Sequence, residues 1–143
     1  MELSPQEIIR EITDNLVMDY RAFVHKETGQ LLCVPNVLDN IYFDEELFAE
    51  ELEELENNFS DYFEIEKWES REAFNWMVQF AESLEEDAQM QNKLFRALEQ
   101  RKPFARFKYT LEDNLDYLQA WYKFRDEKQR AYVAKELEML KGG

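Results

Sequence analysis

The sequence contains very little cysteine, histidine, glycine and proline. Its 143 residues include one cysteine, one histidine, three glycines and three prolines. One cysteine excludes an internal disulfide, and one cysteine with one histidine excludes a zinc site of the usual Cys/His type within one chain. The sequence also has no glycine-rich phosphate loop and no calcium-loop pattern. It therefore predicts no metal site, no cofactor and no catalytic residue.

Long apolar runs are also absent. The longest, such as LLCV at 31–34, are far shorter than the ~20 residues of a membrane-spanning helix. The N-terminal stretch MELSPQEIIREI is acidic and amphipathic, without the basic and apolar regions of a signal peptide. These absences predict a cytoplasmic protein that does not bind membranes.

The composition predicts a folded chain. Hydrophobic residues make up 45% of the sequence and aromatic residues 15%, which argues against disorder despite 34% charged residues. The length suits a single domain, residues 1–143. Within it we expect an acidic part, residues 1–69, and a helical part, residues 70–141.

Charge is unevenly distributed along the chain. The formal net charge is −15. Residues 1–90 contain 5 Lys or Arg and 24 Asp or Glu, a net −19, whereas residues 91–143 contain 12 and 8, a net +4. The two halves either neutralise each other, or the second half offers a basic surface to an anionic partner.

Hydrophobic periodicity in the first half predicts a helix and three strands. Ser4, Pro5 and Glu7 are typical of a helix start. YRAFVHK and LLCVP then alternate on either side of ETGQ, which predicts a hairpin in which Gly29 takes a positive φ. YFEIEKW, residues 62–68, predicts a third strand.

The remaining segments predict helices. They are a Glu-rich helix over 43–59, a helix that follows Ser70, one that begins with a Ser83/Glu86 capping box, one that begins at Pro103, and a last helix capped by Asp113 or Asn114 and ending near Leu140. The predicted fold class is α+β: a small antiparallel sheet, made of the hairpin and a third strand, packed with a mainly helical C-terminal half.

Two features of the acidic half allow more than one interpretation. His25 and Cys33 are each unique and could be neighbours across the hairpin, as in a Cys–His nucleophile. The favoured alternative is a half-buried strand histidine and a buried thiol. Seven glutamates between Glu45 and Glu56 suit a divalent cation or a basic partner, or imitate a phosphate backbone. The favoured alternative is an ordinary solvated helix face, with Glu46, Glu50, Glu53 and Glu54 opposite the apolar stripe.

Basic residues gather where the helix at Pro103 begins. Arg101, Lys102, Arg106 and Lys108 are candidates for binding an anion or a partner, because the N-terminus of a helix attracts negative charge. The helical spacing turns Phe104, Phe107 and Leu111 inward, with Lys108 beside them and Arg106 on the opposite side. The favoured alternative is that these cations pair with carboxylates of residues 1–90.

The last helix has an apolar arc too wide for one contact surface. Leu115, Leu118, Tyr122, Val133, Leu137 and Leu140 form its predicted core stripe. Tyr117, Trp121 and Phe124 form a second stripe, which either packs on the neighbouring helix, as favoured, or stays exposed as an aromatic patch. Arg125 lies within the first stripe, so we expect it to form a partly buried ion pair with a carboxylate of residues 1–90.

The segment LFRALEQRKPFARFKYTLEDNLDYLQAWYKFRDEKQRAYVAKEL resembles an uncharacterised family of small acidic bacterial proteins that has no assigned function. The resemblance rests on a shared pattern at Leu94, Ala97, Leu98, Phe104, Arg106, Phe107, Lys108, Trp121, Tyr122 and Phe124. YRAFVHKETGQLL and FNWMVQF also resemble segments of that family. The resemblance implies no activity.

The sequence thus predicts a non-enzymatic cytoplasmic protein that binds another macromolecule. An enzyme of unrecognised type is a third and less favoured interpretation. The expected partner is another protein, and self-association remains open. The alternative is nucleic-acid or nucleotide binding through the basic and aromatic segment 101–130. Nucleic acid is the less expected partner, because the strong negative charge of residues 1–90 repels phosphate.

Overall fold

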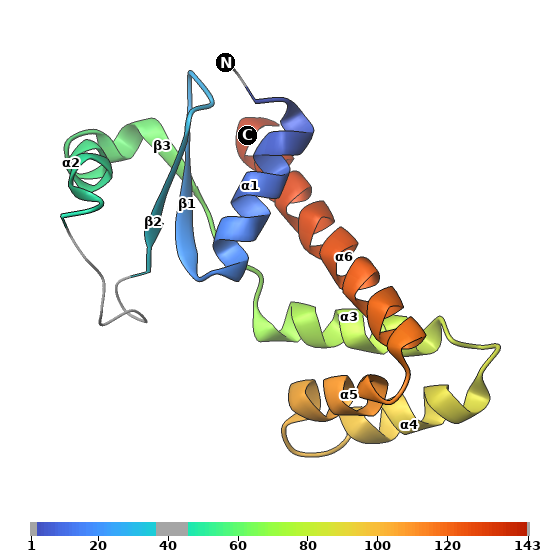
Figure 1. Ribbon diagram of the computed structural model, residues 1–143. Coiled ribbons are helices and arrows are strands. Elements are labelled where there is room, and N and C mark those ends of the chain that lie inside the picture. The colour runs from blue at the N-terminus through green and yellow to red at the C-terminus, as the bar shows by residue number, and fades with distance from the viewer. Residues whose placement is uncertain (1–2, 37–45, 143) are drawn as a thin grey trace. The chain divides into compact units, whose positions relative to one another are not determined.

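The computed structural model describes residues 3–36 and 46–142 (Figure 1). It confirms the α+β class, with a three-stranded antiparallel sheet and a helical C-terminal half. The chain forms two compact units, Met1–Lys67 with Arg130–Gly143 and Trp68–Gln129. The first boundary lies close to the expected division at residue 69, whereas the last residues group with the sheet. That residues 1–143 act as one domain stays a prediction.

The sheet of the first unit has the strand order β2-β1-β3. Its strands are β1 (Tyr20–His25), β2 (Leu31–Pro35) and β3 (Tyr62–Ile65). The hairpin between β1 and β2 is confirmed, and Gly29 has the predicted positive φ, 74°. A side chain at this position would be strained by that backbone conformation.

Two helices cover opposite faces of this sheet (Figure 1). Helix α1 (Pro5–Val17) begins as predicted, because the Ser4 side chain accepts a hydrogen bond from the backbone N–H of Glu7. It buries Ile12 and Leu16. Helix α2 (Ala49–Asn58) lies on the other face, where its buried Leu55 belongs to one apolar cluster with Phe23, Val34 and Tyr62. The first residues of the predicted Glu-rich helix, 43–45, lie outside the described residues.

The second unit consists of four helical segments. They are α3 (Ser70–Glu82), α4 (Ala88–Leu98), α5 (Pro103–Glu112) and the first part of α6 (Leu115–Gly142). Pro103 begins α5 as predicted, and Asn114 accepts a hydrogen bond from the backbone N–H of Tyr117 at the start of α6.

The start of α4 was predicted wrongly. Asp87, not Ser83, caps this helix, accepting a hydrogen bond from the backbone N–H of Met90 at 3.0 Å. Ser83 instead ends α3: its backbone is helical, its N–H is bonded to the carbonyl of Gln79, and its hydroxyl donates to the carbonyl of Phe80. An N-cap residue has a non-helical backbone, whereas Ser83 has φ −71° and ψ −13° and closes the last turn of α3, so it does not take that role.

Aromatic side chains form the centre of the second unit. The ring centroid of Phe107 lies 5.0 Å from that of Trp121 and 6.3 Å from that of Phe80, in edge-to-face arrangements. Phe80 also contacts Trp121 and Phe124, both at 5.5 Å. Such pairs add to the stabilisation that burial provides. These contacts explain why α3, α5 and α6 hold together.

Two residues expected in the core of the helical unit are exposed. Leu115 is 67% exposed and Phe104 is 45% exposed. Each belongs to the first turn of its helix, before the helix reaches the buried Trp121 or Phe107. Helical spacing assigns a side chain to a face, but it does not say where along that face a neighbouring helix begins. Among the residues that the structure describes, no helix is long and apolar enough to cross a membrane.

Candidate functional site

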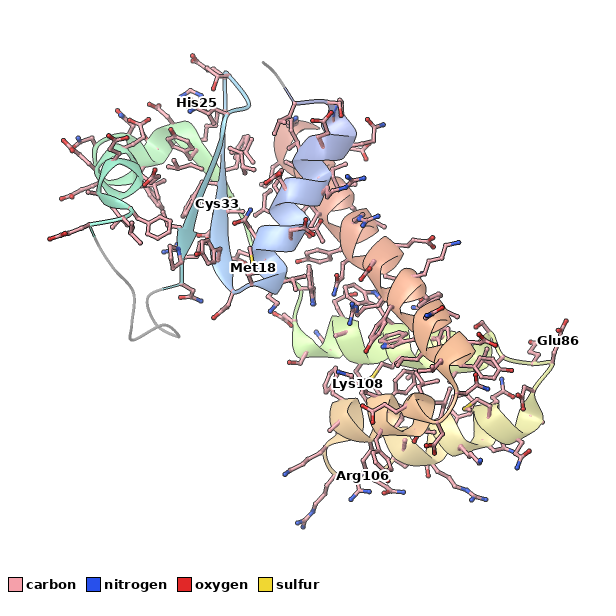
Figure 2. The ribbon with its side chains drawn as sticks, viewed as in Figure 1. Met18, His25, Cys33, Glu86, Arg106 and Lys108 are labelled. Carbon is pink, nitrogen blue, oxygen red and sulfur yellow. The ribbon has the colours of Figure 1, made fainter. Side chains whose placement is uncertain are left out.

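The four candidate basic residues lie in α5 and in the turn before it. Arg101, Lys102, Arg106 and Lys108 are all exposed. Lys102 has a left-handed backbone, with φ at 54°, and Arg106 folds back so that its Nε donates to the carbonyl of Arg101 at 2.9 Å. Figure 2 shows Lys108 on the side of α5 that faces α3 and Arg106 on the opposite side, as the helical spacing predicts.

These cations form no direct ion pairs within their own unit. None of the four is paired with a carboxylate of residues 68–129. The expectation that Arg106 or Lys108 pairs with the acidic half is not met by residues 68–90, and it stays a prediction for residues 1–67. Long exposed side chains lose entropy when held in a pair, and water solvates them well without one. The basic charge of this segment thus remains accessible to a partner.

Arg125 forms an ion pair, but not the expected one. Its Nη2 lies 3.1 Å from Oδ1 of Asp126, the next residue of α6, and its side chain is 38% exposed. Its guanidinium also lies over the ring of Tyr122, with Cζ 4.8 Å from the ring centroid. Arg125 reaches water at the edge of the apolar stripe, so its charge needs no buried partner within this unit. Its pairing with a carboxylate of residues 1–67, in the other unit, stays a prediction.

An apolar groove opens between α3, α5 and α6 within the second unit. It has a volume of about 180 Å³. Its walls are mostly apolar and come from Trp76 and Met77 of α3, Phe104 and Phe107 of α5, and Trp121 and Tyr122 of α6. Lys108, Arg125 and Gln129 are the polar residues that line it. The groove therefore combines aromatic walls with two positively charged side chains.

The candidate aromatic patch is mostly occupied within the protein. Trp121 is only 7% exposed, so the favoured prediction that it packs inside the fold is confirmed. Phe124 is half-buried, stacks on Trp121 and lies under the ammonium of Lys128. Tyr117 donates a hydrogen bond from its hydroxyl to Asp87 at 2.8 Å. The exposed-patch alternative is therefore wrong for Trp121.

His25 and Cys33 do not form a nucleophilic pair. Cys33 lies opposite Ala22 in the register of β1 and β2, which places it on the other face of the sheet from His25. Figure 2 shows the two residues at separate levels of the hairpin. His25 Nδ1 accepts hydrogen bonds from the backbone N–H groups of Glu27 and Thr28. Burial raises the pKa of the Cys33 thiol to about 12, so it carries no reactive thiolate at neutral pH.

The Glu-rich helix is not a simple solvated face. Glu54 accepts hydrogen bonds from the hydroxyl of Tyr62 at 2.6 Å and from the side-chain amide of Asn58 at 2.7 Å. These bonds lower the pKa of Glu54. One glutamate of the predicted acidic cluster therefore serves the fold. In the described part of the chain, no group of three or more His, Cys, Asp and Glu side chains is placed to hold a metal ion.

Sequence reasoning missed the groove itself. Phe104 was expected in the core, whereas its exposed ring forms one wall of the groove. Its spacing from Lys108, four residues along one helix, was the available signal, since such residues lie on the same face. Trp76 and Met77 of α3 gave no sign of lining a groove.

Fold and groove together define a small α+β protein whose helical unit carries an open apolar groove with a basic edge. The chain belongs to an uncharacterised protein family, UPF0158, whose family model matches residues 14–141. The family resemblance drawn from the sequence is thereby confirmed. A search among curated proteins found no match to the chain. A search among solved structures also found none.

Proposed function

We propose that this protein is a non-enzymatic interaction module of the bacterial cytoplasm, which binds a partner protein through its helical unit. One observation carries the proposal: the cations Lys108 of α5 and Arg125 of α6 line an apolar groove of the same unit. Protein interfaces combine an apolar centre with a polar rim, and Arg and aromatic residues are enriched in them. The groove and its edge have this combination.

The size of the groove argues for a macromolecular partner. Pockets that enclose small-molecule ligands typically measure about 300–1,000 Å³ and contain a few convergent polar groups. The groove, at about 180 Å³, is smaller, and its polar side chains are Lys108, Arg125 and Gln129. These three side chains do not form a catalytic arrangement of nucleophile, base and orienting group. The groove therefore suits one side chain of a larger partner better than a whole small-molecule ligand.

Nucleic-acid binding is the second candidate, favoured by a different observation. Tyr109 is 73% exposed and Phe104 is 45% exposed, on the same helix as Arg106 and Lys108. Exposed rings beside cations are typical of proteins that stack single-stranded bases. The net charge of −15 opposes this function more than it opposes a short acidic segment, because a nucleic acid adds a further negative charge with every nucleotide.

Affinity capture with matched variants tests the proposal. Immobilised wild-type protein, an Arg101→Glu/Lys108→Glu variant and an Arg130→Glu/Lys135→Glu control are incubated with a lysate of the native cell. The two variants have the same net charge, and all four substituted residues are exposed. We expect specific proteins with the wild type and the control, and their loss with the α5 variant.

Two results would contradict the proposal. Equal recovery with all three baits would show that the basic edge binds no partner. Recovery that disappears after nuclease treatment would favour the second candidate, nucleic acid.

A further inference from the structure

The groove of the helical unit has room for one large side chain. Its volume is about 180 Å³. For comparison, an apolar cavity of about 150 Å³ in a protein core binds one benzene molecule. The walls include the rings of Trp76, Phe107 and Trp121, which are at most 7% exposed, so the base of the groove is apolar. A phenyl ring or a branched aliphatic side chain would bury its surface there.

The two cations that line the groove are available to a charged group beside that side chain. Lys108 is exposed and forms no ion pair with a carboxylate of its own unit, residues 68–129. Arg125 is half-exposed, and its partner Asp126 is its own neighbour in α6 rather than a residue from another helix. A carboxylate entering with an apolar side chain would therefore meet Lys108 without displacing a partner.

We infer that the groove binds an acidic segment of a partner protein, in which one aromatic side chain enters the groove and an adjacent carboxylate pairs with Lys108. This inference rests on the proposed function and names the chemistry of its partner. Apolar burial supplies most of the affinity. The ion pair supplies the preference for acidic over basic segments, because rim charges mainly determine specificity.

The shape of the site favours a peptide over a nucleic acid. A base stacks on a flat exposed ring, whereas Phe107 and Trp121 are buried and line the inside of a groove. A peptide side chain projects from its backbone and can enter such a space. Arg106 lies on the opposite side of α5 from Lys108, so these two cations do not follow one strand of phosphates across one surface (Figure 2).

Short peptides of defined sequence test the inference on the full chain. The probes are acetylated, amidated tripeptides: Asp-Phe-Asp, its neutral form Asn-Phe-Asn, its basic form Lys-Phe-Lys, and Asp-Ala-Asp without the ring. The readout is the NMR signal of the Met77 methyl group in the groove wall, assigned with a Met77→Leu variant. We expect saturable shifts with Asp-Phe-Asp, binding about threefold weaker with Asn-Phe-Asn, weaker still with Lys-Phe-Lys, and none with Asp-Ala-Asp.

Substitutions at the edge of the groove separate charge from folding. Lys108→Glu should reverse the ranking, so that Lys-Phe-Lys binds more tightly than Asp-Phe-Asp. Arg106→Glu is the matched control: it makes the same change of charge in the same helix, but on the other side (Figure 2), and should leave the ranking unchanged. A reversed preference cannot arise from unfolding.

Two further variants change the groove itself: one fills it, and the other removes part of its wall. Ala73→Leu extends a side chain into the groove and should abolish the response to every peptide. Phe104→Ser removes an exposed wall and should weaken Asp-Phe-Asp binding at least threefold without disturbing the buried Phe107. The Phe104 variant keeps the test valid if the Ala73 variant does not fold.

The opposite outcomes overturn the inference. It fails if no peptide shifts the Met77 signal, if charge does not affect the ranking, or if a single-stranded oligonucleotide shifts the signal at lower concentration than Asp-Phe-Asp. If no peptide binds, but the Arg101→Glu/Lys108→Glu variant still loses the captured proteins, only the groove inference is rejected and the proposed function is retained. If the peptides bind, but this variant captures the same proteins as the wild type, the proposed function is rejected.

Discussion

The hydroxyl of Tyr117 donates a hydrogen bond to Oδ2 of Asp87 at 2.8 Å, across 30 residues of sequence. The other oxygen of the same carboxylate accepts from the backbone N–H of Met90 at 3.0 Å. One aspartate therefore caps α4 and connects it to the first turn of α6. The bond to Met90 and then the bond to Tyr117 lower the pKa of Asp87, and Asp87 raises the pKa of Tyr117.

The first prediction concerns stability at acid pH. Because folding lowers the pKa of Asp87, its ionised form stabilises the fold above about pH 3.9, the value in an unfolded chain. This stabilisation is lost as the pH falls through the lower folded pKa. Asp87→Asn keeps a good capping residue but removes the charge. Urea unfolding between pH 2.5 and 6 should show a weaker pH dependence in this variant, and an unchanged dependence would contradict the role of the carboxylate.

The second prediction concerns the aromatic core. Trp121 is 7% exposed and contacts Phe80 and Phe107. Trp121→Ala should therefore lower the free energy of unfolding by about 3–5 kcal/mol, as for other large aromatic side chains removed from a core. Tyr109→Ala is the control, because Tyr109 is 73% exposed, and it should change stability by about 0.5 kcal/mol or less. A loss below about 1 kcal/mol for Trp121→Ala, measured by urea unfolding, would contradict the packing described.

The third prediction concerns thiol reactivity. Burial, with the negative charge of Glu11, raises the pKa of Cys33 to about 12. At pH 8 the thiolate fraction of Cys33 is then on the order of a thousandfold smaller than that of a cysteine with the ordinary pKa of about 8.5. Alkylation by iodoacetamide at pH 8 should be at least a hundredfold slower in the native protein than in urea. Similar rates in both conditions would show that the thiol is accessible and ionised in the fold.

The fourth prediction concerns alkaline titration. The hydrogen bond to Glu54, followed by burial, raises the pKa of Tyr62 to about 12. Because the folded pKa is raised, the neutral hydroxyl stabilises the fold below about pH 10, the unfolded value, and this contribution is lost as the pH rises through about 12. Absorbance at 295 nm should show a tyrosine that ionises near pH 12 and is missing in Tyr62→Phe.

A matched variant checks the cause of that shift. Glu54→Gln keeps an acceptor but removes the charge, so the pKa of Tyr62 should fall toward 10. A late-ionising tyrosine that remains in Glu54→Gln would show that burial alone sets the pKa. Because Tyr62 is only 8% exposed, burial also raises its pKa, and this variant separates burial from the hydrogen bond to Glu54.

Local signals in the sequence determined the elements of this fold. Ser4 with Glu7, Gly29, Pro103 and Asn114 each act within a few residues, through a cap, a turn or a fixed φ. Such effects depend on the chain immediately around them, so they can be predicted from the sequence. Ser83 shows the limit of such local signals. Asp87, four residues later, caps α4 instead, and Ser83 forms the end of α3.

Contacts between distant residues were decided only by the tertiary structure. The sequence indicated that Trp121 and Phe107 would be buried, but not that Phe104 would remain at the surface as a wall of a groove. Nor did it indicate that Arg125 would pair with Asp126 while Lys108 has no carboxylate partner within its own unit. Helical periodicity orients each side chain about its own axis, and only the packing of one helix on another determines which positions meet a neighbour and which meet water.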